Sequence, residues 1–174
     1  MLAQKIKVLI ADDHIIFRRG LKMLLASIDG IELVGEAENG LDLLAVAGRY
    51  TPDVFLIDIS MPVMDGVMAT KELCKRHPGA KVIALSVFGQ ETHIMEMLDA
   101  GALGYLMKNA DKDDIEQAIV SVYNNRSYFC TESNKQVKDL IEKFQSGSKE
   151  HLVVFTEREK DIITLICKGF ISKE

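Results

Sequence analysis

The chain has 174 residues and no Trp, and 48% of its residues are hydrophobic while 6% are aromatic. This length suggests one domain, or one domain and part of a second, with enough apolar residues for a sizeable core. The net charge is -5 and neither half is strongly basic. Charge alone therefore does not provide a nucleic-acid binding surface.

The cysteine pattern and the length of the apolar runs indicate where in the cell the protein is expected. Cys74, Cys130 and Cys167 are odd in number and far apart, which argues against a disulfide framework or a zinc site and fits a reducing environment. No apolar run approaches the roughly 18 residues of a membrane helix, and no signal-like segment precedes Asp12. We expect a soluble, cytoplasmic protein without a membrane partner.

The first part of the chain alternates short apolar runs with amphipathic segments. Ile6–Ala11 predicts a strand, residues 14–27 a helix, Ile31–Ala37 a second strand, and Asn39 can cap a second helix. The expected core face of this second helix, at i, i+3, i+4 and i+7, consists of Leu41, Leu44, Ala45 and Gly48. Inside the first helix, Gly20 is either simply tolerated or required by close packing on the sheet.

The alternation continues along the chain. Further strands are predicted at residues 53–58, 81–86 and 103–107, and helices at residues 66–76, 91–100 and 112–124. The turn signals Pro62, Asp65-Gly66 and Pro78-Gly79 separate them. Strands that alternate with helices predict an α/β fold with a doubly wound parallel sheet.

Polar side chains stand where the predicted strands end. Asp12 and Asp13 follow the first strand, Asp58 ends the third, Ser86 ends the fourth and Lys108 follows the fifth. In such sheets the carboxyl ends of the strands form the ligand-binding edge. Neighbouring carboxylates repel each other and favour a hard cation such as Mg²⁺. The cation would neutralise charge on an incoming phosphoryl group, with Asp58 as the nucleophile.

These residues carry a family resemblance. The set that resembles the receiver domain of two-component response regulators is Asp12-Asp13, Asp58, Met61-Pro62, Asp65-Gly66, Ser86 and Lys108. The resemblance implies a receiver domain at residues 1–125, with a flavodoxin-like sheet of five parallel strands in the order 2-1-3-4-5. It also implies a sensor histidine kinase as the partner that phosphorylates Asp58.

The resemblance implies a role for each residue of the metal site. Asp13 and Asp58 match direct Mg²⁺ ligands, Asp12 matches a neighbour acting through water or charge, and the backbone carbonyl of Ser60 matches the third protein ligand. The plainer alternative for Asp12 and Asp13 is an N-cap or first-turn charge of the following helix. His14 is assigned to the surface at the start of that helix.

The remaining matched residues concern the phosphoryl group. Ser86 matches the hydroxyl that hydrogen-bonds it, and Lys108 matches the lysine that pairs with one of its oxygens. Tyr105 matches an aromatic switch residue, or is an edge-strand aromatic packed on the helix at 91–100; both interpretations remain open. Val87 stands where relatives often have small residues, so we expect slower loss of the phosphoryl group than with Ala.

The C-terminal part resembles a linker and an output domain. Residues 126–150 contain a predicted amphipathic helix, 132–145, which either packs on its own domain or joins a homodimer. Residues 151–174, beginning with the capping box Thr156-Glu-Arg-Glu159, resemble the N-terminal fragment of a LuxR-type helix-turn-helix domain, as in NarL/FixJ regulators. The recognition helix would follow Glu174, so we expect only the full-length protein to bind DNA specifically and regulate transcription.

Two other function classes compete with a phosphorylation switch. Phosphatases of the dehalogenase class also use an aspartyl nucleophile, but they need a second Asp two residues later, where this chain has Ser60. A phosphate-independent interaction module would not need all the matched polar positions. We therefore expect no enzymatic turnover of external substrates.

Overall fold

The computed structural model describes residues 5–87 and 91–129. All described elements belong to the first of two compact units of the chain, Met1–Leu140. The predicted linker helix at residues 132–145 and the predicted helix-turn-helix fragment at residues 151–174 lie outside the described residues.

The described residues form six strands and five helices. The strands are β1 (Ile6–Ala11), β2 (Ile31–Ala37), β3 (Val54–Asp58), β4 (Val82–Ser86), β5 (Gly104–Met107) and β6 (Tyr128–Phe129). The helices are α1 (Ile15–Ala26), α2 (Gly40–Tyr50), α3 (Gly66–Arg76), α4 (Glu91–Asp99) and α5 (Lys112–Tyr123). Each element predicted within the described residues is present, and where both of its ends were predicted they differ by one residue at most.

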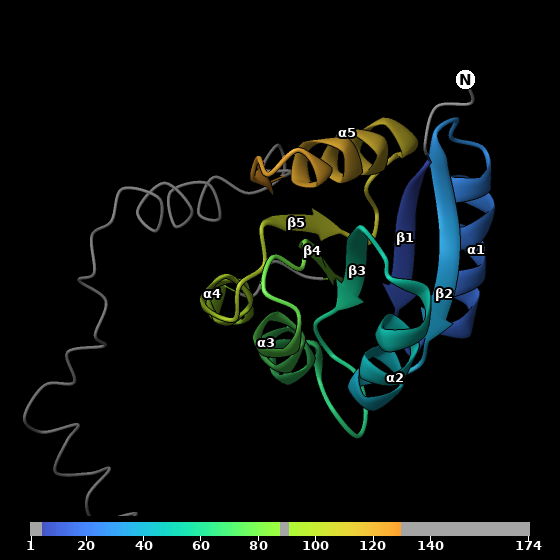
Figure 1. Ribbon diagram of the computed structural model, residues 1–174. Coiled ribbons are helices and arrows are strands. Elements are labelled where there is room, and N and C mark those ends of the chain that lie inside the picture. The colour runs from blue at the N-terminus through green and yellow to red at the C-terminus, as the bar shows by residue number, and fades with distance from the viewer. Residues whose placement is uncertain (1–4, 88–90, 130–174) are drawn as a thin grey trace, which may run out of the picture. The chain divides into compact units, whose positions relative to one another are not determined.

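The strands form one parallel sheet in the order β2-β1-β3-β4-β5-β6 (Figure 1). The predicted order of the first five strands is confirmed, but the predicted number of strands is wrong. The sixth strand has two residues and pairs Tyr128 with Gly104 and Phe129 with Tyr105. A two-residue apolar stretch has no periodicity, so its sequence does not reveal a strand.

Helices cover both faces of the sheet. In Figure 1, α1 and α5 lie on one face, while α2, α3 and α4 lie on the other. The central strands β3 and β4 are buried along their whole length, which explains why their sequences are almost continuously apolar. The core between the sheet and the α1–α5 layer includes Val8, Ile10, Leu21, Leu25, Leu56, Ile83, Leu106, Ile119 and Val122.

Helix α2 corrects one sequence-based expectation. Its buried residues are Gly40, Leu43 and Ala47, whereas Leu41, expected in the core, is 51% exposed. The helix is apolar on nearly every side, so spacing alone does not select the face that packs. The predicted cap is confirmed, because the backbone N–H of Asp42 donates to Asn39 Oδ1 at 3.0 Å.

Gly20 in α1 is exposed, and a Cβ added there would have no heavy atom within 4 Å. Close packing therefore does not require this glycine, and the interpretation that it is simply tolerated is confirmed.

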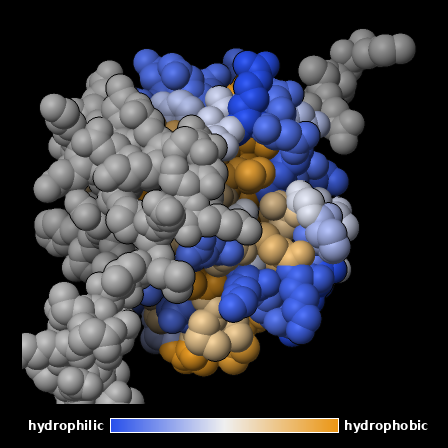
Figure 2. All heavy atoms as spheres, turned by 90° about the vertical axis from the view of Figure 1, so that its left-hand side faces the viewer, coloured by the Kyte–Doolittle hydropathy of each residue, from blue (hydrophilic) through white to orange (hydrophobic). Residues whose placement is uncertain are grey.

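No helix in the described part of the chain is long and apolar enough to cross a membrane. Figure 2 shows one face of the domain, on which hydrophilic and hydrophobic residues both reach the surface. Large apolar side chains exposed in the described part include Ile16, Val63 and Met68.

Candidate functional site

The strand register places the predicted polar residues side by side. Ala11 at the end of β1 is the partner of Ile57 in β3, so the next residues, Asp12 and Asp58, are neighbours at the carboxyl edge of the sheet. On the other side of β3, Ser86 ends β4, and the backbone N–H of Lys108 donates to its carbonyl oxygen at 2.7 Å. The structure thus brings together side chains that are far apart in the sequence.

Lys108 joins two of the carboxylates. Its Nζ lies 2.7 Å from Asp12 Oδ2 and 2.8 Å from Asp58 Oδ2. The ammonium also lies 5.0 Å from the ring centroid of Phe17 in α1. The side chain of Lys108 is only 9% exposed, so its charge acts on the two carboxylates with little screening by water.

The phosphoacceptor candidate Asp58 is 3% exposed. Burial raises the pKa of its carboxyl above the usual range; the hydrogen bond from Lys108 acts against this shift, and the negative charge of Asp12 adds to it. Burial by itself would lower the pKa of Lys108, but Asp12 and Asp58 outweigh it and raise that pKa. Lys108 therefore remains a cation, while the charged form of the Asp58 carboxyl is disfavoured by its surroundings.

Oxygen atoms at this edge fit a hard divalent cation. One ligand atom each from Asp12, Asp13, His14 and Asp58 can be chosen so that all lie within 4.8 Å of one another. Asp12 is fully buried, and no described residue gives its Oδ2 a hydrogen bond of good geometry, although the Lys108 ammonium lies 2.7 Å away. Carboxylate oxygens grouped in this way suit Mg²⁺, which takes oxygen ligands.

The predicted third ligand, the backbone carbonyl of Ser60, stays a prediction. Ser60 contributes a contact through its backbone N–H, which lies 3.4 Å from Asp58 Oδ1. Its side chain is exposed.

The backbone of Gly66 packs directly against the backbone carbonyl of Asp58. A Cβ on Gly66 would lie 2.1 Å from the backbone oxygen of Asp58, so no side chain fits there. The N–H of Gly66 donates to the Ile59 carbonyl at 2.9 Å, and Asp65 caps α3 by accepting from the N–H of Met68 at 2.8 Å. The Asp65-Gly66 pair therefore starts α3 and fixes the backbone of Asp58 together.

Tyr105 lies in the interior of the sheet, since β5 is flanked by β4 and β6. The edge-strand interpretation of this residue is therefore wrong, whereas its role as a switch stays a prediction. Its side chain is 2% exposed. Burial raises the pKa of its hydroxyl, and the nearby Ser86 acts in the opposite direction. Val87, next to Ser86, is 52% exposed at the mouth of the site.

The predicted surface position of His14 at the start of α1 is confirmed, since its side chain is 62% exposed, but its contacts with the acidic pair were not foreseen. This residue is the N-cap of α1 without a side-chain cap, so Asp12 and Asp13 are not caps as the plainer alternative had proposed. The N–H of His14 donates to Asp12 Oδ1 at 2.7 Å, and its Nδ1 lies 2.9 Å from Asp13 Oδ1. Its position directly after the acidic pair was the available signal.

Sequence reasoning also missed Arg18, a cation of α1 that is 7% exposed. It donates a hydrogen bond from Nη1 to the backbone carbonyl of Asp12. The signal was a charged residue on the buried stripe of a helix, at i, i+3 and i+7 with Leu21 and Leu25.

Comparison with known proteins agrees with this geometry. Residues 8–120 match the family described as the response regulator receiver domain. The chain is 32% identical over 183 residues to the transcriptional regulatory protein DegU of Brevibacillus brevis, covering 97% of this chain and 78% of DegU. It is 37% identical over 161 residues to the response regulator GacA of Pseudomonas protegens, covering 92% of this chain and 75% of GacA.

A solved structure shares the fold. The signal receiver domain of the response regulator NarL from Mycobacterium tuberculosis superimposes with a TM-score of 0.68 at 29% identity, covering 71% of this chain and 99% of that structure. The chain therefore belongs to the response regulators of two-component systems and carries their receiver domain over residues 8–120.

Proposed function

We propose that Asp58 accepts a phosphoryl group from the phosphohistidine of a sensor kinase, and that this modification switches the domain. The observation that carries the proposal is the bridge from Lys108 to Asp12 and Asp58, at 2.7 and 2.8 Å, in a chain that belongs to the response regulators. It supplies a nucleophilic carboxylate, a fixed positive charge and an acidic pocket at one edge of the sheet.

The transfer is an in-line substitution at phosphorus. An oxygen of the Asp58 carboxylate forms the new P–O bond, the P–N bond to the kinase imidazole breaks, and the imidazole leaves with the electron pair and takes a proton from solvent. Asp13 and Asp58, with the carbonyl of Ser60, would hold Mg²⁺, and Asp12 would act through water or charge. When bound, Mg²⁺ would neutralise charge on the phosphoryl oxygens.

Lys108 acts at a fixed position during this step. Its ammonium already lies 2.8 Å from Asp58 Oδ2, so a phosphoryl group on Asp58 would arrive beside a positive charge. Because Lys108 is largely buried, this charge is worth more than it would be in water. It would pair with a phosphoryl oxygen and stabilise the product.

Ser86 and Tyr105 would transmit the change. Phosphorylation adds a charge of about -1.5 to -2 and three acceptor oxygens. The Ser86 hydroxyl would turn toward these acceptors, and Tyr105, buried beside it, would respond on the face formed by α4, β5 and α5. The result would be a shift between two populations of the domain.

The output of the switch would be control of transcription. DegU is described as a transcriptional regulatory protein, and the chain covers 78% of its length. We propose residues 1–125 as the receiver domain, 126–150 as a linker and 151–174 as part of a LuxR-type DNA-binding domain. Phosphorylation of Asp58 would change self-association or DNA binding of the full-length protein.

Incubation with acetyl phosphate and Mg²⁺, followed by intact mass measurement, tests the proposal. We expect one phosphoryl group on the wild type, and none on Asp58→Asn or in the presence of a chelator. Asp53→Asn is the matched control, because Asp53 lies beside the opposite end of the same strand and accepts from the N–H of Lys7 at 2.8 Å. A wild type that gains no phosphoryl group, or an Asp58→Asn variant that still gains one, would contradict the proposal.

A further inference from the structure

Arg18 is a buried cation outside the set of residues that would contact the phosphoryl group. It belongs to α1, and its side chain is 8% exposed. Burying a guanidinium is unfavourable unless hydrogen bonds and charges compensate it. Its partners therefore show what the fold gains from keeping an arginine at a core position.

The inner partner is the backbone of the acidic pair. Arg18 Nη1 donates to the carbonyl oxygen of Asp12, and on the other side of this residue the N–H of Asp12 donates to the Ala37 carbonyl at 3.1 Å. The Asp12 carbonyl, which accepts from Arg18, belongs to the peptide unit that joins Asp12 to Asp13. Because a peptide unit is planar, holding its oxygen fixes the directions in which both aspartate side chains leave the backbone.

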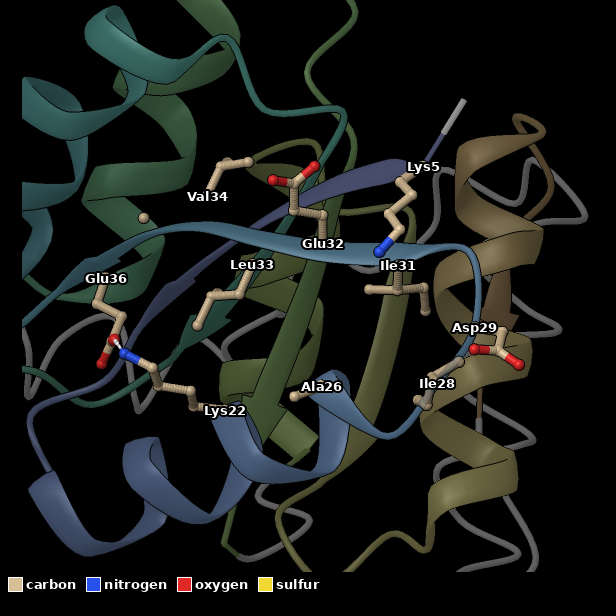
Figure 3. Close-up of a pocket in the computed structure, with 11 residues that line it drawn as sticks. Lys5, Lys22, Ala26, Ile28, Asp29, Ile31, Glu32, Leu33, Val34 and Glu36 are labelled. Atoms are coloured by element: carbon tan, nitrogen blue, oxygen red, sulfur yellow. Dashed lines mark hydrogen bonds and ion pairs between the residues drawn. The ribbon is translucent and has the colours of Figure 1, made fainter. Parts of the chain in front are cut away.

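The outer partners are acidic residues at the end of β2 and just beyond it. Arg18 Nη2 donates to Glu38 Oε1 at 2.8 Å, and its Nε lies 3.5 Å from Glu36 Oε2. The other oxygen of Glu36 lies 2.7 Å from Lys22 Nζ, a contact visible at the end of a surface pocket of about 480 Å³ along β2 (Figure 3). These contacts hold the guanidinium in one orientation.

A lysine could not reproduce this arrangement. The planar guanidinium presents several donors in a rigid fork, so one side chain reaches the Asp12 carbonyl and the two glutamates at once. An ammonium is a compact charge on a flexible stem. It would keep the positive charge near β2 but would not hold the peptide unit and both glutamates together.

We propose that Arg18 is a positioning residue of the cation site: it fixes the Asp12–Asp13 peptide unit so that both carboxylates face the same cation as Asp58. This inference rests on the proposed function, because it assumes Mg²⁺ at these carboxylates. Groups behind metal ligands commonly change metal affinity by about 10- to 100-fold when they are removed. Arg18 acts through the ligands and does not touch the cation.

Titration of the 174-residue protein with Mg²⁺ in a calorimeter tests the inference. We expect Arg18→Lys to weaken Mg²⁺ binding by about 10-fold or more. The matched control is Arg19→Lys, because Arg19 is the neighbouring residue on the same helix but is exposed. This control should bind Mg²⁺ as the wild type does.

Thermal unfolding in chelator separates positioning from stability. A purely structural role would lower the melting temperature of Arg18→Lys and leave the Mg²⁺ affinity of the folded protein unchanged, and this result would overturn the inference. If Arg18→Lys does not fold, the double variant Glu36→Gln/Glu38→Gln decides. Weakened Mg²⁺ binding in that variant supports the inference, and wild-type affinity contradicts it.

Failure of this inference is distinguishable from failure of the proposed function. A wild type that binds no Mg²⁺ would contradict both. A wild type that binds Mg²⁺ and accepts a phosphoryl group, with an equal affinity in Arg18→Lys, would contradict only the role of Arg18.

Discussion

The interior of the sheet and its carboxyl edge follow opposite rules. Within β1 and β3, the side chains of Leu9, Ile10, Leu56 and Ile57 are fully buried and apolar. One residue beyond the end of β1, and at the end of β3, the chain places carboxylates next to each other with Lys108 between them. The interior stabilises the fold by burying apolar area. The edge instead brings buried charged groups together, which is unfavourable unless they are paired.

This difference explains where stability and chemistry reside. The Lys108 ammonium contacts the carboxylates of Asp12 and Asp58, and the Asp13 carboxylate belongs to the same acidic group, so the negative charge is only partly compensated. The raised pKa of Asp58 has burial as its main cause, to which the charge of Asp12 adds. A bound cation would therefore stabilise the edge, and it would also offset the negative charge that a phosphoryl group brings.

Truncation of a core side chain should have the largest effect on stability and no direct effect on the edge. Leu56 is fully buried in β3, two residues before Asp58. We expect Leu56→Ala to lower the free energy of unfolding by about 2–5 kcal/mol, through lost burial and the cavity left behind. Urea denaturation measures this loss. A loss of Mg²⁺ affinity in the folded variant would contradict the division between interior and edge.

A side chain at Gly66 should damage both regions. The Cβ of Gly66→Ala would collide with the Asp58 carbonyl, so we expect a loss of about 1–3 kcal/mol in the free energy of unfolding. The same collision would displace the backbone of Asp58 and slow phosphorylation by acetyl phosphate. Thermal unfolding and intact mass measure the two effects. A variant that is destabilised but phosphorylated at the wild-type rate would show that the backbone of Asp58 tolerates this shift.

The pH dependence of the free energy of unfolding should reveal the raised pKa of Asp58. Its folded pKa lies above its unfolded value, so at low pH the carboxyl is protonated in both states and no stability is lost. As the pH rises from about 4 through the folded pKa, the unfolded chain ionises first and the free energy of unfolding falls.

We therefore expect the melting temperature of Asp58→Asn, minus that of the wild type, to increase over this pH range in the presence of chelator. Mg²⁺ should reduce the difference, because it compensates the carboxylates of the wild type. A difference that stays constant with pH would contradict the pKa shift.

The smallest effect is expected at Gly20, which is exposed on α1. Its Cβ position is open, and glycine in a helix interior is less favourable than alanine by about 1 kcal/mol. Gly20→Ala should raise the free energy of unfolding by about 0.5–1 kcal/mol and leave Mg²⁺ binding unchanged. Chemical denaturation with a magnesium titration checks both expectations, and a destabilised variant would show an unrecognised contact of α1.

The same contrast decides what could be predicted from the sequence. The strands of the interior were predicted because each is an apolar run with clear turn signals at its ends. The edge was predicted because polar residues follow those runs, and parallel strands bring their ends together. Strand β6 was missed because Tyr128 and Phe129 are too few to show a period, and the packed face of α2 was missed because most of its sides are apolar.

Contacts that depend on side-chain direction were harder to foresee. Arg18 lies on the stripe of Leu21 and Leu25, but nothing in this spacing says that its guanidinium reaches the Asp12 carbonyl. His14 was assigned to the surface, and its exposed ring does lie there, yet Nδ1 contacts Asp13. Such contacts arise from rotamers that tertiary packing selects, which periodicity does not describe.

The most direct test of the central claim is to locate the phosphoryl group on the chain. Borohydride reduces an aspartyl phosphate to homoserine, so treatment of the protein after incubation with acetyl phosphate and Mg²⁺, followed by peptide mapping, identifies the modified residue. The account predicts homoserine at position 58 and unmodified Asp12 and Asp13. Homoserine at position 12 or 13, or no reduced residue in a protein that binds Mg²⁺, would contradict it.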